Sequence, residues 1–464
     1  MTSGKSVEAW FRELPVSLLV SWMFHRKNMP LAPDTSKAVN PLGMTSRFGP
    51  MRHGISGNRL RTTAGRLLLC AVTFEGAFLG SGRMAVIGPL TLKMWLFTLM
   101  LLYIGWSLLC FDRIRLGTAL LIASFAALLC LGGMNGVAQG ANMQFLGEDV
   151  SPLLSFLALP FFELTMRTRQ DILLVIRVVV IAAIGMACCY AVIVVSLWLS
   201  LWLGVASLGT LYGWLAMSSA TDFGISGDGT GEAGRFAYSG ALFLGIAIIF
   251  LAFKKTRWSK AGVLFLFFSL ILAASRGLFL TLALSAFCYV LIAPVRSIRK
   301  LGMCFGLIVL AAACLPLLFS LAGDRTASNE ARLNTISQVS ERIGPASLVV
   351  GHGFGIGVPE KPKHMEIAYL EIFHKQGALG LLWWAALIGT LATRFRKALR
   401  SNYRALTYSL FLVALFVLLE SATNPYIDNP VGMYPFLISF VGLGVLAQQE
   451  RAQAASPKLN ASGI

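Results

Sequence analysis

Charged residues are scarce in this chain. Only 13% of its 464 residues are charged, whereas 56% are apolar, and a typical soluble domain carries about 25% charge. The charges that are present gather in short clusters between long apolar runs. This pattern excludes a soluble globular protein and predicts an all-α, polytopic membrane protein.

Cysteine is absent from the polar segments. All eight cysteines lie inside apolar runs, which excludes a disulfide framework and a zinc site of the usual spacing. Residues 229–234 match the GxGxxG pattern, but no strand precedes them, so they do not predict a dinucleotide site. We therefore expect neither a metal nor a cofactor.

Acidic residues are outnumbered, with 21 Asp and Glu against 39 Lys and Arg, for a net charge of +18. Such an excess can indicate a nucleic-acid partner. Here the basic residues flank apolar runs, where the positive-inside rule places them. We interpret the charge as membrane topology and expect no nucleic acid.

The apolar runs predict about twelve transmembrane helices. The runs are 67–82, 94–111, 116–134, 151–166, 172–196, 237–253, 261–275, 277–293, 301–321, 376–393, 405–421 and 432–448. They divide the chain into a basic cytoplasmic N-terminal tail (1–66), spans one to nine (67–321), a large periplasmic loop of short helices (322–375), spans ten to twelve (376–448) and a cytoplasmic C-terminal tail (449–464).

The connecting charges agree with an alternating topology. The basic clusters near residues 113, 167, 254, 296 and 394 all fall on one side if the spans alternate. The positive-inside rule makes that side the cytoplasm, with both termini inside. The segments 135–150, 322–375 and 422–431 then lie on the outer face.

The large outer loop contains the clearest sign of chemistry. Three of the five histidines, His352, His364 and His374, lie within it, and Glu366 follows His364 by two residues. A histidine or carboxylate in such a loop is suited to act as a general base for a reaction at the outer face. The residues alone leave the choice between Glu366 and His364 open, and a loop with solvent-facing polar side chains is the alternative.

Two arginines interrupt or border apolar segments. Arg276 lies in a long apolar stretch, and Arg235 ends a glycine-rich segment before the next span. An arginine in an apolar helix costs on the order of 2.5–3.5 kcal/mol at the bilayer centre, so it usually faces a cavity or a charge. Each could bind an anionic substrate or anchor a helix end.

These features occur in an order that resembles the O-antigen ligase and Wzy-type polymerase superfamily of bacterial envelope glycosyltransferases. The resemblance covers about residues 90–448. It rests on Ser275-Arg276-Gly277, the Gly351–Gly357 turn, and Tyr369-Leu370 followed by the sequence KQGALG from Lys375.

The resemblance implies a GT-C-like, metal-independent inverting enzyme of the bacterial inner membrane. Its donor would be an undecaprenyl-pyrophosphate-linked glycan, with Arg235, Arg276 and Arg332 at the pyrophosphate and Glu366 or His364 as the base. The ligases have a His-Asn pair where this chain has Glu366, and glutamate there resembles the polymerase branch.

The sequence therefore predicts a polymerase of lipid-linked oligosaccharide repeat units, making exopolysaccharide or O-antigen at the periplasmic face. The expected partners are the glycan donor, a glycan or lipid-linked acceptor, membrane lipid, a chain-length regulator and a flippase. One alternative is a ligase that moves glycan to lipid A-core or protein. A transporter or flippase of lipid-linked glycan is an alternative of another class, although no internal repeat is visible.

Overall fold

A computed structural model describes most of the chain. The described residues are 54–80, 86–87, 90–110, 112–204, 223–226, 235–238, 240–254, 256–273, 275–294, 297–306, 308–309 and 326–455. The chain divides into two units, residues 1–55 and 56–464, and the architecture below is that of the second.

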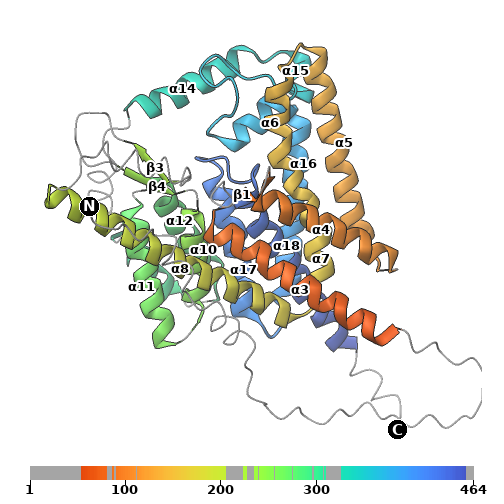
Figure 1. Ribbon diagram of the computed structural model, residues 1–464, viewed down its shortest axis with the longest axis vertical. Helices are drawn as coiled ribbons and strands as arrows, with labels where there is room; N and C mark the ends of the chain where they lie inside the picture. Colours follow the sequence, from red (N-terminus) through yellow and green to blue (C-terminus); the bar gives the residue numbers. More distant parts are fainter. Residues whose placement is uncertain are drawn as a thin grey trace, which may run out of the picture. The chain divides into compact units, whose positions relative to one another are not determined.

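Helices dominate the described residues, in agreement with the all-α prediction (Figure 1). The helices are α3 (Gly54–Phe78), α4 (Leu92–Leu109), α5 (Leu116–Ala138), α6 (Met143–Leu153), η1 (Leu154–Ala158), α7 (Leu159–Thr165), α8 (Arg169–Trp202), α10 (Ala241–Ala252), α11 (Arg257–Leu272), α12 (Arg276–Ile292), α14 (Thr326–Glu341), α15 (Pro345–Val350), α16 (Ala368–Ala398), α17 (Arg404–Glu420) and α18 (Pro430–Ala455). Two antiparallel strand pairs add to them, β1 (Val86–Ile87) with β2 (Leu90–Thr91) and β3 (Phe223–Ser226) with β4 (Arg235–Tyr238). The expectation that no strand precedes residues 229–234 was wrong, but β3 pairs antiparallel with β4 and is not part of the βαβ unit of a dinucleotide site.

Six helical segments are long and apolar enough to cross a membrane. They are Leu92–Leu109, Leu116–Ala138, Met143–Thr165, Arg169–Ser196, Ala368–Ala398 and Pro430–Gln449. Five other predicted runs coincide with α3, α10, α11, α12 and α17, and most of the run 301–321 lies outside the described residues. A polytopic membrane protein is therefore supported, and the count of twelve stays a prediction.

Helix α3 extends beyond the first predicted apolar run. Helix α3 begins at Gly54, 13 residues before the predicted start at residue 67, so the end of the predicted tail is helical. Its first turns contain Arg59, Arg61 and Arg66. These arginines lower the hydropathy of the segment, so the apolar pattern did not predict a helix there. The Arg66 guanidinium pairs with Asp171 of α8 at 2.8 Å, so this polar part of α3 has a structural partner.

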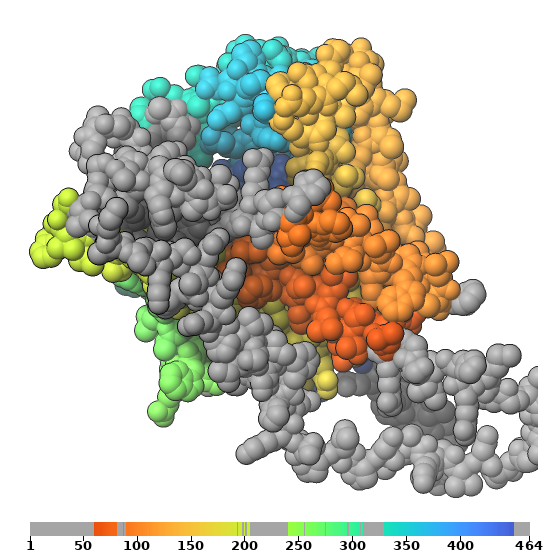
Figure 2. All heavy atoms as spheres, viewed as in Figure 1, coloured from red at the N-terminus to blue at the C-terminus, as the bar shows by residue number. Residues whose placement is uncertain are grey.

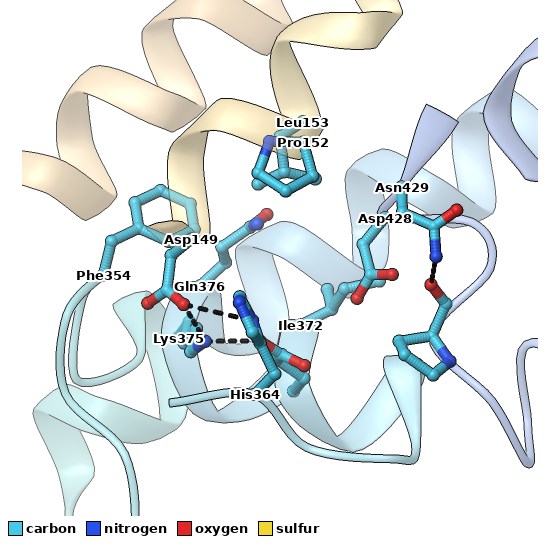
Figure 3. Close-up of a pocket in the computed structure, with 12 residues that line it drawn as sticks. Asp149, Pro152, Leu153, Phe354, His364, Ile372, Lys375, Gln376, Asp428 and Asn429 are labelled. Carbon is cyan, nitrogen blue, oxygen red and sulfur yellow. Dashed lines mark hydrogen bonds and ion pairs between the residues drawn. The ribbon is translucent and has the colours of Figure 1, made fainter. Parts of the chain in front are cut away.

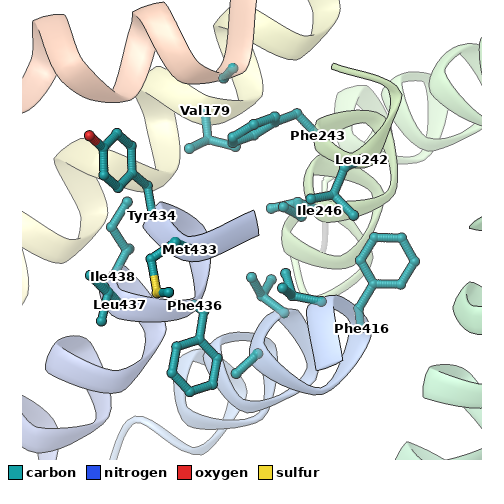
Figure 4. Close-up of a cluster of buried hydrophobic side chains, with 14 of the residues drawn as sticks. Val179, Leu242, Phe243, Ile246, Phe416, Met433, Tyr434, Phe436, Leu437 and Ile438 are labelled. Carbon is teal, nitrogen blue, oxygen red and sulfur yellow. The ribbon is translucent and has the colours of Figure 1, made fainter. Parts of the chain in front are cut away.

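The centre of the bundle is formed by α10 and α18 (Figure 4). The apolar window of α18 is completely buried, and α10 packs between α8, α11 and α17. Apolar burial gains little free energy in lipid, so close packing must hold these helices together. At Gly245 of α10, an added Cβ would lie 2.4 Å from Cζ of Phe416.

The short helices of the segment 322–375 gather at one end of this bundle. Helix α15 contacts α16 and α5, and Figure 1 shows it beside the end of α5. Figure 2 shows the surface of the same region. The described residues of this segment thus include two helices, α14 and α15, and its place outside the membrane stays a prediction. Residues in or next to the predicted outer segments 135–150, 322–375 and 422–431 line a common cavity. Such proximity is expected if the three segments lie on the same side of the membrane.

Candidate active site

A cavity of about 170 Å³ lies where these three segments meet (Figure 3). Helix α6 forms one wall, the start of α16 another, and the connection between α17 and α18 a third. Its lining residues are Asp149, Pro152, Leu153, Phe354, His364, Glu371, Ile372, Lys375, Gln376, Pro425, Asp428 and Asn429. Five of them are ionisable, which is unusual beside membrane-spanning helices.

A buried lysine connects two carboxylates at the base of the cavity. Lys375 Nζ lies 2.7 Å from Asp149 Oδ1 and also bonds to Glu371 Oε1, one turn earlier on α16. The Lys363 carbonyl accepts a third bond from this ammonium at 3.0 Å. The side chains of Lys375, Asp149 and Glu371 are 2, 2 and 8% exposed. The three charges are therefore stabilised by one another rather than by hydration.

His364 lies at the edge of this cluster. Its Nδ1 is 3.4 Å from both Asp149 Oδ1 and Glu371 Oε1, and its side chain is 46% exposed. The hydrogen bond with Glu371 raises the pKa of His364, against the opposing effect of burial. With Nδ1 held by carboxylates, Nε2 is the ring nitrogen available to a substrate proton.

Asp428 faces the same cavity from the connection before α18. In Figure 3 its carboxylate is directed toward the space beside His364, with Asp149 and Lys375 on the far side in the view. Asp428 Oδ1 is buried without a hydrogen-bond partner in the described part of the chain. Burial, followed by the nearby charge of Glu371, raises the pKa of Asp428 to about 7.

The glycine-rich turn predicted as a motif closes the cavity by backbone contact. Gly351, Gly353 and Gly355 have φ of 75°, 89° and 81°, in the region that favours glycine. The Gly353 N–H donates to the Lys375 carbonyl at 3.0 Å, and the Gly355 N–H donates to Asp149 Oδ2 at 2.8 Å. The turn therefore fixes both the backbone of Lys375 and the side chain of Asp149.

Helix α16 is interrupted next to this turn. Gly377 has φ 65° and ψ −162° inside the helix, and an added Cβ would lie 2.4 Å from the Val349 carbonyl oxygen. The KQGALG sequence is thus the point where α16 opens to accept the glycine-rich turn. The glycine-rich turn and the KQGALG sequence, two of the motifs on which the family resemblance rests, therefore pack against each other.

Gly136 of α5 offers a test of this packing. An added Cβ would lie 2.1 Å from the Phe354 carbonyl oxygen, so Gly136→Ala must push the turn away from α5. We expect a loss of about 1–3 kcal/mol, as for other overpacked sites, measured as a lower unfolding temperature in detergent.

Gly133 is the matched control on the same helix, because an added Cβ there would have no atom of the described residues within 4 Å. Gly133→Ala is expected to leave stability unchanged or to raise it by up to about 1 kcal/mol through helix propensity. Equal destabilisation by both substitutions would contradict the contact between α5 and the turn.

Glu366 and Arg332 are brought together, but outside this cavity. Arg332 Nε lies 2.7 Å from Glu366 Oε2, and Lys361 Nζ lies 3.1 Å from Glu366 Oε1. Burial alone would raise the pKa of Glu366, but the hydrogen bonds from Lys361 and Arg332 outweigh it and lower the pKa. A carboxylate held by two cations is a weaker base than His364.

Arg276 begins α12 next to a second polar group. Its neighbour Gly277 packs so closely that an added Cβ would lie 2.8 Å from Glu420 Oε1. Glu420 accepts hydrogen bonds from Thr281 at 2.7 Å and Asn424 at 2.6 Å. Glu420 therefore lies next to the Ser-Arg-Gly corner at which α12 begins.

Arg235 begins strand β4, paired with Ser226 of β3. Its side chain lies outside what the structure describes, so its predicted role in pyrophosphate binding stays a prediction.

One set of side chains has the spacing of a metal site. Asp149, His364 and Glu371 each offer a ligand atom within 4.8 Å of the others. The Lys375 ammonium already binds both carboxylates. The Lys375 ammonium thus occupies the position between the Asp149 and Glu371 carboxylates, so these side chains do not fit a metal ion.

No protein-family model matches the chain. A curated O-antigen polymerase from Shigella flexneri is 24% identical to it over 313 residues, which are 67% of this chain and 76% of that protein. The chain is similar to an O-antigen polymerase. This similarity confirms the resemblance indicated by the Ser-Arg-Gly corner, the glycine-rich turn and the start of α16.

Sequence reasoning found His364 but missed the residues around it. Asp149, Glu371 and Asp428 were not singled out, and Lys375 was noted only as part of a motif. One sequence signal could have found Glu371 and Lys375. They are four residues apart just before a predicted apolar run, and oppositely charged residues at this spacing can form an ion pair on a helix. Nothing in the sequence connected them with Asp149, 226 residues before Lys375.

Proposed function

We propose that this protein polymerises lipid-linked oligosaccharide repeat units into O-antigen or exopolysaccharide. The similarity to an O-antigen polymerase over 67% of the chain carries this proposal. The cavity around His364 supports it, because it supplies a base and fixed charges at the end of a helical bundle.

The reaction is an inverting glycosyl transfer. Nε2 of His364 takes the proton of an acceptor sugar hydroxyl as its oxygen forms a bond to the anomeric carbon of the donor. The bond from that carbon to the pyrophosphate breaks, and undecaprenyl pyrophosphate leaves with the electron pair. Asp149 and Glu371 orient the imidazole and stabilise its protonated form.

Arginine side chains receive the departing pyrophosphate. Arg332, Arg276 and Arg235 are the proposed ligands, since guanidinium groups bind phosphate oxygens in pairs. Glu366 holds the Arg332 side chain in place at 2.7 Å until the anionic substrate binds. In this proposal Glu366 positions an arginine and His364 is the base.

Asp428 binds the acceptor sugar. Its buried Oδ1 makes no hydrogen bond within the described residues, and sugar hydroxyls are suitable donors. Ionisation of Asp428 strengthens that contact.

The pH dependence of polymerisation tests this role. His364 must be neutral and Asp428 ionised, so the rate is expected to fall as the pH drops below about 7, the pKa of Asp428. With two groups to deprotonate, the logarithm of the rate should fall with a slope approaching about 2 per pH unit. Asp428→Asn should be slower and should reduce the slope to about 1. An unchanged profile in Asp428→Asn would rule out its participation.

The protein is proposed to act in the bacterial inner membrane, with both termini in the cytoplasm and the cavity at the periplasmic face. Its partners would be the glycan donor, a glycan or lipid-linked acceptor and membrane lipid. A flippase would supply the donor, and a chain-length regulator would act on the product.

The glycans of a strain deleted for this gene test the function. Separation by gel of single lipid-linked repeats, lipid-linked polymer and acceptor-linked polymer should show accumulated single repeats and no polymer. Lipid-linked polymer that never reaches its final acceptor would instead identify a ligase. An unchanged profile would contradict both a polymerase and a ligase, because each is required for the normal polymer.

A further inference from the structure

A second cavity, of about 240 Å³, lies at the other end of α16. Arg394 of this cavity is seventeen residues after Gly377, where α16 is interrupted, which corresponds to about 26 Å of helix at 1.5 Å per residue. That length is close to the roughly 30 Å thickness of a bilayer's hydrocarbon core. The two cavities therefore lie at opposite membrane interfaces.

Three cations line this second cavity. Its lining residues are Arg115, Gly117, Thr118, Arg394, Lys397, Gly444, Ala447 and Gln448. Both guanidinium groups approach Gly444, where an added Cβ would lie 3.0 Å from Arg394 Nη1 and 3.7 Å from Arg115 Nη1. Two like charges thus meet over a residue without a side chain, and both line the cavity.

Specific contacts hold these arginines in place. Arg115 Nε lies 2.6 Å from Glu163 Oε1, and Arg115 Nη2 donates to Gln448 Oε1 at 2.7 Å. Arg394 Nη1 donates to the Phe440 carbonyl at 2.9 Å, and its guanidinium lies 3.8 Å from the centre of the Phe440 ring.

The positive charge of the cavity exceeds its negative charge. Among the residues that the structure describes, Glu163 alone forms an ion pair with any of the three cations. Lys397 is exposed and lies three residues after Arg394 on the same helix face. An anion bound here would contact preorganised guanidinium groups without first breaking a cation–carboxylate pair at Arg394 or Lys397.

We propose that this cavity binds the phosphate headgroup of an anionic phospholipid. Its place at a membrane interface favours a lipid as the source of the phosphate, and basic pockets between transmembrane helices are suited to such headgroups. The positive-inside rule places the cavity in the cytoplasmic leaflet. The contact would join α5, α16 and α18 at the end opposite to the active site.

The test measures lipid bound to the purified full-length protein. Phosphatidylglycerol or phosphatidylcholine with the same acyl chains is titrated into protein in uncharged detergent, and bound lipid is counted by native mass spectrometry. We expect preferential binding of phosphatidylglycerol. Lys397→Gln should weaken it about fivefold, which corresponds to about 1 kcal/mol for a basic residue near the headgroup, and Lys397→Arg should retain it.

Arg396→Gln is the matched control, because it removes the same charge from an exposed neighbour that does not line the cavity. It should change binding less than twofold. Equal weakening by Arg396→Gln and Lys397→Gln would overturn the proposal by showing only general charge attraction. Displacement of phosphatidylglycerol by millimolar inorganic phosphate would also overturn it, because the site would then take free phosphate.

Discussion

His364→Ala is expected to abolish polymer formation while the protein stays in the membrane at its normal level. Loss of a general base typically costs about 10²–10⁴-fold in rate. Because the His364 side chain is 46% exposed, its removal leaves little cavity in the packed core and should not unfold the protein. The measurement is polymer yield in a deletion strain that carries the variant, normalised to membrane protein.

Glu366→Gln is the informative comparison for His364→Ala. It weakens the contacts with Arg332 and Lys361 but leaves the His364 cavity intact, so polymer should be reduced rather than lost. Full activity in His364→Ala with complete loss in Glu366→Gln would reverse the two roles and make Glu366 the base.

Lys375→Met is expected to have the largest effect on stability. It removes the ammonium between Asp149 and Glu371, whose side chains are only 2 and 8% exposed. Breaking a buried ion pair by removing one partner costs about 3–5 kcal/mol. We expect a much lower unfolding temperature in detergent and a reduced amount of protein in the membrane.

Lys363→Met is the control for this prediction. Lys363 pairs with Glu148 at 3.2 Å, but the two side chains are 47 and 34% exposed, so its loss should leave the unfolding temperature almost unchanged. Adding Asp149→Asn to Lys375→Met should restore part of the stability by removing an unpaired charge. Equal effects of Lys375→Met and Lys363→Met would contradict the buried network.

The transmembrane elements were largely predictable because hydropathy is a local property. The predicted runs 116–134 and 277–293 correspond to Leu116–Ala138 and Arg276–Ile292 within a few residues. Only part of helix α3 was predicted, because its arginines interrupt the apolar run. An arginine is accommodated there by an acidic partner on another helix. Asp171, which pairs with Arg66, is 105 residues away, and no local pattern reports such a contact.

The candidate site was predictable in its location but only partly in its residues. The sequence left the choice of base open between His364 and Glu366. They precede α16, which begins at Ala368, yet they are directed to different partners: His364 contacts Asp149 and Glu371, whereas Glu366 contacts Arg332 and Lys361. The network around Lys375 depends on the packing of α6 against the glycine-rich turn and α16, which requires contacts across more than 200 residues.

Reconstitution tests the central claim most directly. The purified protein in liposomes is supplied with lipid-linked single repeat units, and the products are separated by length. We expect lipid-linked chains of two or more repeats with the natural sequence and none with His364→Ala, whereas Arg396→Gln should behave like the natural protein. Transbilayer movement of the single repeats without any lengthening would contradict the account and indicate a transporter.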